Sequence, residues 1–201
     1  MRNAGVIFDI DGTLVDSTEF EGRLYVAAVL EVLGDVSIRS NWGDYEHVSD
    51  SGILRQICHE NGLSASRYER RVRTRFSELV SEHLRQRGSC QPVPGALRLF
   101  DELRSTPGVQ VGIATGGWGH TARMKLRLHP MCHERIRIME RCRAMMPAME
   151  QTIYVGDGEW DRRASQILRW RFVGVGNRLC GRCQHWLPDF STPHVLNVLF
   201  G

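Results

Sequence analysis

The chain has 201 residues, of which 42% are hydrophobic and 24% charged, and its formal net charge at pH 7 is +3. This length and apolar content suffice for a folded protein with a substantial core. No apolar run approaches the roughly 20 residues that span a membrane, so we expect no membrane partner. An apolar strand begins almost at the first residue, which argues against a secretory signal and favours a cytoplasmic protein with six cysteine thiols.

The basic residues are interspersed with acidic ones, and the densest basic patch lies between residues 67 and 75. No aromatic residues alternate with these arginines in the manner of a nucleic-acid site, and we interpret the patch as a solvated helix face. We therefore expect no nucleic-acid partner.

The first predicted element is a buried strand at residues 5–8, followed at once by two carboxylates, Asp9 and Asp11. Alternation along a strand points both side chains the same way. Two unpaired carboxylates repel each other, so a cation is expected between them, and a hard divalent cation prefers oxygen ligands. The sequence Gly12-Thr13 then predicts a sharp turn.

Residues 17–90 have helical spacing and no strand-rich pattern. We expect a first helix with Phe20, Leu24 and Ala28 on its buried face, a second around Ile53 and Ile57, and a third with Val72 and Phe76 buried. The polar and aromatic segment 42–52 is either a substrate-contacting segment or a helix entry with Asp50 or Ser51 as N-cap.

A turn at residues 92–95 returns the chain to strand-containing sequence, with a helix expected around residues 97–103. A second strand is predicted at residues 109–114, and it ends in Thr115 and Gly116. A hydroxyl and a backbone N–H at a strand end are suited to hold phosphoryl oxygens. A helix over residues 119–128 follows.

A third strand at residues 152–155 leads into a second acidic segment, which contains Asp157 and Asp161. We expect a helix at residues 160–170, a further strand at 171–176 and a final helix at 192–200. Polar residues thus follow three buried strands, and ligands bind at the carboxyl ends of parallel strands.

The segment Asp9-Ile10-Asp11-Gly12-Thr13-Leu14-Val15-Asp16 resembles the first motif of the haloacid dehalogenase superfamily, the aspartate-nucleophile phosphohydrolases. The residues around Thr115 resemble its second motif, and Gly156 to Asp161 resemble its fourth. The resemblance implies an α/β fold: a Rossmann-like parallel sheet core at residues 1–16 and 91–201, with an inserted all-helical cap domain at 17–90. Such a cap is typical of the phosphoglycolate-phosphatase-like branch and closes over the site.

The same resemblance implies roles for individual residues. Asp9 would be the nucleophile and Asp11 the general acid and base, with Mg²⁺ as cofactor. Asp9, Asp11, Asp157 and Asp161 would hold the metal, the Asp11 ligand being its backbone carbonyl. Thr115 and Gly116 would bind the phosphoryl group.

The family also has a basic residue, usually lysine, that neutralises the nucleophile and the phosphoryl group. This chain departs from the pattern, because Lys125 is its one lysine and lies early for that role. We favour Arg135, which can hold an oxyanion bidentately, and keep Arg137 and Lys125 as alternatives. The segment 129–133 is shorter than the strand or loop that the family usually has there, which leaves the position of the basic residue open.

The implied function is a Mg²⁺-dependent phosphatase that hydrolyses a small phosphorylated metabolite through an aspartyl-phosphate. A phosphomutase and a non-catalytic phosphate-binding relative are the alternatives, whereas the presence of Asp11 argues against a dehalogenase. The sequence is compatible with a monomer or a homodimer. Cys180 and Cys183 have metal or redox spacing, but two cysteines alone do not complete a zinc site.

Overall fold

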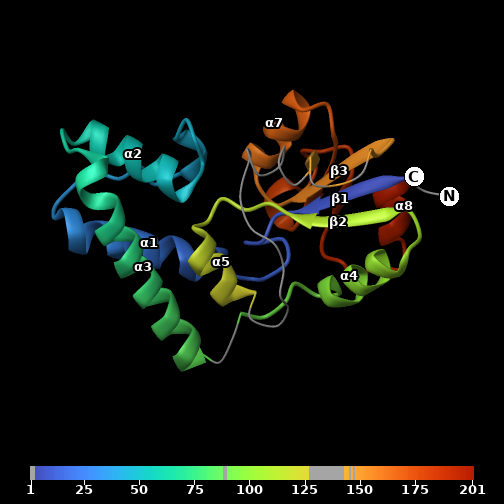
Figure 1. Ribbon diagram of the computed structural model, residues 1–201, viewed down its shortest axis with the longest axis horizontal. Coiled ribbons are helices and arrows are strands. Elements are labelled where there is room, and N and C mark those ends of the chain that lie inside the picture. The colour runs from blue at the N-terminus through green and yellow to red at the C-terminus, as the bar shows by residue number, and fades with distance from the viewer. Residues whose placement is uncertain (1–2, 88–89, 127–142, 145, 147) are drawn as a thin grey trace. The chain divides into compact units, whose positions relative to one another are not determined.

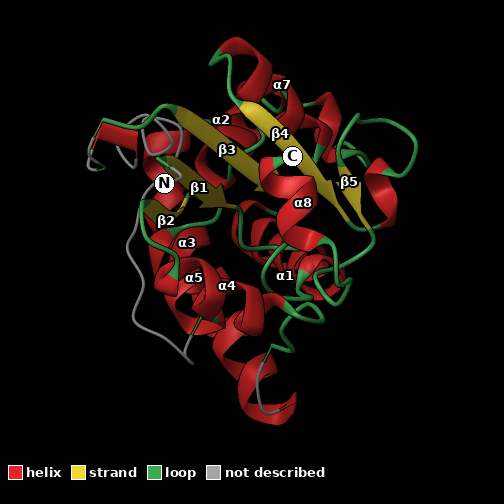
Figure 2. Cartoon of the chain, turned by 90° about the vertical axis from the view of Figure 1, so that its right-hand side faces the viewer, coloured by secondary structure: helices red, strands yellow, loops and turns green. Residues whose placement is uncertain are grey.

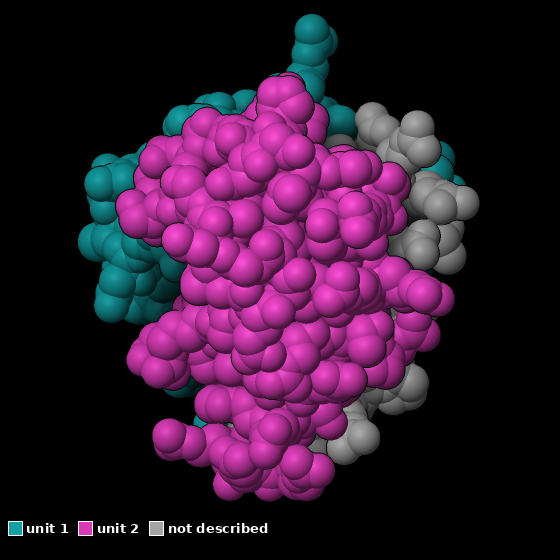
Figure 3. All heavy atoms as spheres, turned by 90° about the vertical axis from the view of Figure 1, so that its left-hand side faces the viewer, with its two compact units in different colours: residues 1–16, 91–115, 129–201 teal, residues 17–90, 116–128 magenta. Residues whose placement is uncertain are grey.

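A computed structural model of the chain describes residues 3–87, 90–126, 143–144, 146 and 148–201 (Figure 1). The chain divides into two compact units, coloured separately in Figure 3: unit 1 comprises Met1–Asp16, Gln91–Thr115 and His129–Gly201, and unit 2 comprises Ser17–Cys90 and Gly116–Leu128. The predicted core domain includes residues 116–128, whereas this division places them in unit 2. The assignment of a core domain and a cap domain stays a prediction.

Unit 1 contains a five-stranded parallel sheet with the strand order β2-β1-β3-β4-β5 (Figure 2). Its strands are β1 (Ala4–Phe8), β2 (Val109–Ile113), β3 (Gln151–Gly156), β4 (Arg171–Val175) and β5 (Trp186–Leu187). The α/β fold class and the four predicted strands are confirmed. The pattern missed β5 because two residues are too short to show alternation.

The register of the sheet brings its strand ends level with one another. Phe8 pairs with Ile113 on one side and with Val155 on the other, and Gly156 pairs with Gly174. The residues that follow β1, β2 and β3 therefore leave the sheet at the same edge.

Helices α4 (Ala96–Ser105), α7 (Glu159–Ile167) and α8 (Val195–Phe200) also belong to unit 1. Helix α7 ends three residues earlier than predicted, where Arg169 adopts a left-handed conformation (φ 57°). The final helix begins three residues later than predicted, at Val195. Phe8 lies in the core, and its ring contacts those of Phe100 and Phe190.

Unit 2 is helical and contains α1 (Thr18–Leu33), the short 3-10 helix η1 (Trp42–Asp44), α2 (Asp50–Glu60), α3 (Ala65–Arg87) and α5 (Gly119–Lys125). Ile53, Ile57, Val72 and Phe76 are buried as predicted. In α1 the buried residues are Tyr25, Ala28 and Val29, whereas Phe20 and Leu24 are only half-buried. The buried face of α1 is thus rotated from the predicted one, because a tyrosine packs inward.

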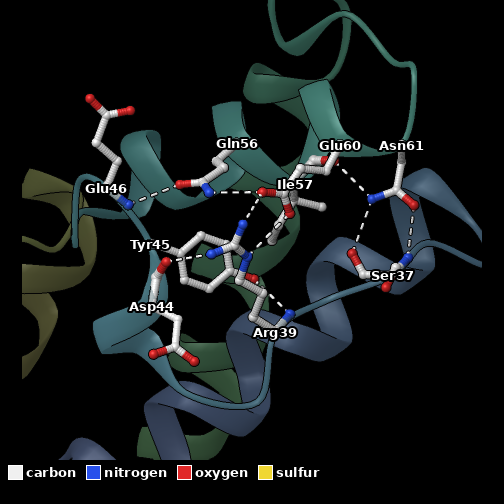
Figure 4. Close-up of polar contacts among 9 residues, drawn as sticks. All are labelled: Ser37, Arg39, Asp44, Tyr45, Glu46, Gln56, Ile57, Glu60 and Asn61. Carbon is white, nitrogen blue, oxygen red and sulfur yellow. Dashed lines mark hydrogen bonds and ion pairs between the residues drawn. The ribbon is translucent and has the colours of Figure 1, made fainter.

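The segment between α1 and α2 is held against α2 by polar contacts (Figure 4). The Arg39 guanidinium lies 2.5 Å from the Glu60 carboxylate, and the Arg39 backbone N–H donates to the Tyr45 hydroxyl at 2.9 Å. The Asn61 side chain exchanges hydrogen bonds with the backbone of Ser37. Within the part of the chain that is described, no helix has the length and apolar character to cross a membrane.

Candidate active site

The carboxyl end of β1 carries the first acidic residues of the site. Asp9 is buried, and its backbone N–H donates to Val155 of β3 at 2.9 Å. The following loop folds around the carbonyl of Ile10, which accepts hydrogen bonds from the N–H groups of Thr13, Leu14 and Val15. Gly12 adopts φ 76°, a conformation that glycine reaches without strain.

The carboxyl end of β3 brings Asp157 and Asp161 beside Asp9. Gly156 allows this approach, because a Cβ atom on it would lie 2.6 Å from Oδ2 of Asp161. The same Asp161 oxygen accepts a hydrogen bond from the N–H of Gly158 at 3.1 Å and so caps the start of α7.

Carboxylate oxygens of Asp9, Asp157 and Asp161 lie within 4.8 Å of one another, and all three residues are buried. Three gathered carboxylates need a cation to offset their repulsion, and oxygen donors of this kind suit Mg²⁺. The residues present therefore fit the expected metal. Asp11 is half-buried and close enough for its charge to act on Asp157. Its proposed carbonyl ligand stays a prediction.

Asp157 has a perturbed titration and a cationic partner. Burial raises the pKa of Asp157 to about 6, Arg178 opposes this rise, and Asp11 adds to it. Nη1 of Arg178 lies 2.9 Å from Oδ2 of Asp157, and its guanidinium lies over the ring of Trp160 at 5.6 Å. Arg178 belongs to η2 (Asn177–Leu179), which follows β4 at the same edge of the sheet.

Arg178 was not among the predicted site residues. Its position two residues after a predicted strand was the available signal, because ligands and charged groups gather at the carboxyl ends of parallel strands. That signal is weak in a chain with 26 basic residues.

The second predicted motif lies where the chain passes from one unit to the other. Thr115 is buried and belongs to unit 1, and Gly116 belongs to unit 2. Their roles in phosphoryl binding stay predictions. Arg135, Arg137 and the segment 129–133 lie outside the described residues.

Lys125, the remaining candidate for the basic residue, lies on α5 in unit 2. Its side chain is fully buried and forms an ion pair with Glu21 of α1. The buried pair gives Lys125 a structural role in the helical unit, and its catalytic role stays an alternative.

Two further sequence features have clear positions. Cys180 and Cys183 are thiols, and neither belongs to a group of three metal-ligating side chains within the described residues. In the segment 42–52, the N-cap of α2 is Ser49, which accepts a hydrogen bond from Gly52 at 2.9 Å. The prediction of Asp50 or Ser51 as N-cap is therefore wrong, because the cap falls one residue earlier.

Comparison with solved structures finds the same fold in several proteins of low sequence identity. CbbY from Rhodobacter sphaeroides, in complex with phosphate, has a TM-score of 0.73 at 18% identity over 99% of both chains. A hydrolase from Pseudomonas syringae has a TM-score of 0.69 at 21% identity over 90% of this chain and 86% of that chain. A provisionally assigned beta-phosphoglucomutase from Thermotoga maritima has a TM-score of 0.55 at 18% identity over 98% of both.

No curated protein sequence matches the chain significantly. The sequence pattern of haloacid dehalogenase-like hydrolases, in contrast, matches residues 4–166, which include the acidic segments after β1 and β3 and the Thr115 segment after β2. Together with the parallel sheet and the gathered carboxylates, this match means that the chain belongs to the haloacid dehalogenase-like hydrolases.

Proposed function

We propose that the protein is a Mg²⁺-dependent phosphatase that hydrolyses a small organic phosphate monoester through an aspartyl-phosphate. The observation that carries this proposal is the gathering of Asp9, Asp157 and Asp161, three buried carboxylates at the ends of β1 and β3. A buried acidic cluster that includes a carboxylate nucleophile is suited to metal-assisted phosphoryl transfer.

In the proposed reaction a carboxylate oxygen of Asp9 forms a bond to phosphorus as the bond from phosphorus to the ester oxygen breaks. Asp11 gives its proton to the leaving alkoxide and then takes one from the water that hydrolyses the aspartyl-phosphate. Asp157 and Asp161 would hold Mg²⁺ together with Asp9 and the Asp11 carbonyl. The bound ion would offset charge on the phosphoryl oxygens.

The phosphoryl group would be oriented by the Thr115 hydroxyl and the Gly116 N–H. Arg135 would neutralise it, with Arg137 and Lys125 as the alternatives. An arginine at this position keeps its charge at all physiological pH values and can hold two phosphoryl oxygens at once.

Structures with the same fold support this substrate class and cofactor. CbbY has been crystallised with phosphate and, as a variant, with xylulose-1,5-bisphosphate. YfnB from Bacillus subtilis, which shares the fold, has been crystallised bound to magnesium. We propose by analogy a small phosphorylated metabolite as substrate, and a cytoplasmic monomer or homodimer as the working form.

A phosphomutase is the second candidate, because one protein with this fold is provisionally assigned as a beta-phosphoglucomutase. Both reactions begin with the same attack by Asp9. A mutase transfers the phosphoryl group to another substrate hydroxyl, whereas a phosphatase transfers it to water.

The decisive experiment measures phosphate release from a panel of monoesters, including phosphoglycolate, a hexose phosphate and p-nitrophenyl phosphate, with Asp9→Asn as the inactive control. We expect release that requires Mg²⁺, stops with EDTA and is absent in Asp9→Asn. An isomerised sugar phosphate without phosphate release would instead establish the mutase. A folded, metal-binding protein that does neither is the non-catalytic relative.

A further inference from the structure

The N-terminus of α2 forms hydrogen bonds with the loop 116–118, which follows the second motif, and both segments belong to unit 2. The backbone N–H of Asp50 donates to the carbonyl of Gly116 at 3.1 Å. In return, the backbone N–H of Trp118 donates to Oδ2 of Asp50 at 2.6 Å. One residue of the helical unit thus holds both ends of the three-residue loop 116–118.

Neighbouring side chains support this clamp, the pair of hydrogen bonds between Asp50 and the loop 116–118. The indole N–H of Trp118 donates to the Ser51 hydroxyl at 2.8 Å. The Tyr25 hydroxyl donates to the Asp50 carbonyl at 2.6 Å. The ring of Trp118 also contacts those of Tyr25 and Phe76, with centroids 5.8 and 5.9 Å apart, and its side chain is buried. Residues from α1, α2 and α3 therefore contact Trp118, the last residue of the loop.

The loop needs such a clamp because it contains two consecutive glycines, Gly116 and Gly117. Glycine has the widest backbone freedom of any residue, so two in succession cost the most entropy to hold in one conformation. Hydrogen bonds to the Gly116 carbonyl and to the Trp118 N–H fix the peptide planes on both sides of Gly117. This order is established before a ligand binds, which lowers the entropic cost of binding.

We propose that Asp50 is a positioning residue for phosphate binding: by holding the Gly116 carbonyl and the Trp118 N–H, it restrains the loop whose first N–H, that of Gly116, would bind a phosphoryl oxygen. This inference rests on the proposed function, in which Gly116 binds the phosphoryl group. Asp50, a residue of the helical unit, would thus order a loop that directly follows Thr115 of unit 1 in the sequence. Asp50 would order the loop through its side-chain oxygen, which accepts the hydrogen bond from the Trp118 N–H, and not through its charge.

The test compares three variants of Asp50. Asp50→Ala removes the acceptor, Asp50→Asn keeps an acceptor oxygen at the same distance without the charge, and Asp50→Glu keeps the charge but moves the oxygens by one methylene. Asp35→Ala is the matched control, because Asp35 is an exposed acidic residue of the same unit. The readouts are the dissociation constant for inorganic phosphate in the presence of Mg²⁺, kcat and KM for p-nitrophenyl phosphate, and the hydrogen-exchange rates of the backbone amides of the loop.

We expect Asp50→Ala to weaken phosphate binding by about tenfold and to speed exchange at Trp118, because the loop must then be ordered on binding. Asp50→Asn should stay within about threefold of the wild type, and Asp50→Glu should resemble Asp50→Ala. If Asp50→Ala does not fold, the contrast between Asp50→Asn and Asp50→Glu carries the same test.

Faster exchange at Trp118 with unchanged phosphate binding in Asp50→Ala would overturn the inference. It would also be overturned if Asp50→Glu behaved as the wild type while Asp50→Asn was impaired, because charge and not position would then be the requirement. In both cases the wild type still binds phosphate and the proposed function stands. A folded wild type that binds no phosphate overturns the proposed function and this inference with it.

Discussion

Arg178 forms a 2.9 Å ion pair with Asp157, a member of the acidic cluster, and so places a positive charge beside the expected metal site. The two residues come from loops that follow adjacent strands, β3 and β4. The Asp157 carboxylate is nearly buried, whereas 48% of the Arg178 side chain is exposed. The guanidinium therefore partly neutralises the cluster from its solvent side and shares Asp157 with any bound cation.

Replacing Arg178 should strengthen metal binding at pH 8. Asp157 is ionised at that pH, so Arg178→Ala frees its Oδ2 and removes a like charge from beside the cation. Because Arg178 is half exposed, we expect a gain in Mg²⁺ or Mn²⁺ affinity of only about fivefold. Isothermal titration calorimetry measures it. Arg163→Ala, which removes an exposed arginine paired with Glu159, should leave affinity unchanged. Weaker binding in Arg178→Ala would mean that Arg178 orients Asp157 more than it competes for it.

The raised pKa of Asp157 predicts the pH dependence of stability without metal. Its pKa is about 6 in the folded protein against an ordinary value of 3.8, and burial is the largest cause. The folded state then binds more protons than the unfolded state between these values. The stabilisation is fully present below the lower pKa and is lost as pH rises through about 6, by about 3 kcal/mol at most.

Urea unfolding in EDTA, from pH 4 to 8, checks this sign. Asp157→Asn should lack this contribution. As pH rises from about 4 to about 6, the wild type should therefore lose unfolding free energy relative to the variant, and above about 6 the difference in unfolding free energy should level off. A difference that is flat across this range would show that Asp157 titrates normally.

Removing one member of the buried ion pair between Lys125 and Glu21 should destabilise the protein more than removing both. Glu21→Ala leaves the fully buried ammonium with one partner fewer, and we expect a loss of about 3 kcal/mol of unfolding free energy. The double replacement Glu21→Met with Lys125→Met removes both charges and should recover most of that loss. Chemical denaturation measures both effects, with Glu19→Ala at an exposed position as the control.

The same double variant separates the two roles considered for Lys125. If the lysine is structural, the stable double variant should keep its kcat for phosphate release. A stable double variant that has lost activity by orders of magnitude would make Lys125 the basic residue of the reaction in place of Arg135.

Gly95 should not accept a side chain. It adopts φ 78° at the N-cap of α4, and a Cβ atom there would lie 2.2 Å from the carbonyl oxygen of Phe190. Gly95→Ala therefore meets both backbone strain and a backbone clash, and we expect a loss of about 3 kcal/mol or more. Gly62→Ala is the matched control, because Gly62 has φ 69° and no atom within 4 Å of its Cβ position. It should cost only about 1 kcal/mol. Equal melting temperatures for the two variants would contradict the clash.

Much of the candidate site was predictable because its residues directly follow buried strands. The strand at residues 5–8 and the one at 152–155 were evident from their apolar runs, and parallel pairing brings the residues after them to one edge of the sheet. Asp9, Asp157 and Asp161 could therefore be assigned to one site before their distances were known. Their carboxylate oxygens lie within 4.8 Å of one another, and their roles as nucleophile and metal ligands stay predictions.

The strands with their acidic ends and most of the helices were predictable from the sequence, since they follow from periodicity and from neighbours along the chain. The fold class was implied by the resemblance of three motifs to a known family. The folded structure was needed to show that Arg178 pairs with Asp157, that Lys125 pairs with Glu21, and that Asp50 holds the loop at Trp118. Those partners are 21, 104 and 68 residues apart. No local sequence pattern distinguishes these three charged residues from the many charged residues on the surface, because the packing of the folded elements selects their partners.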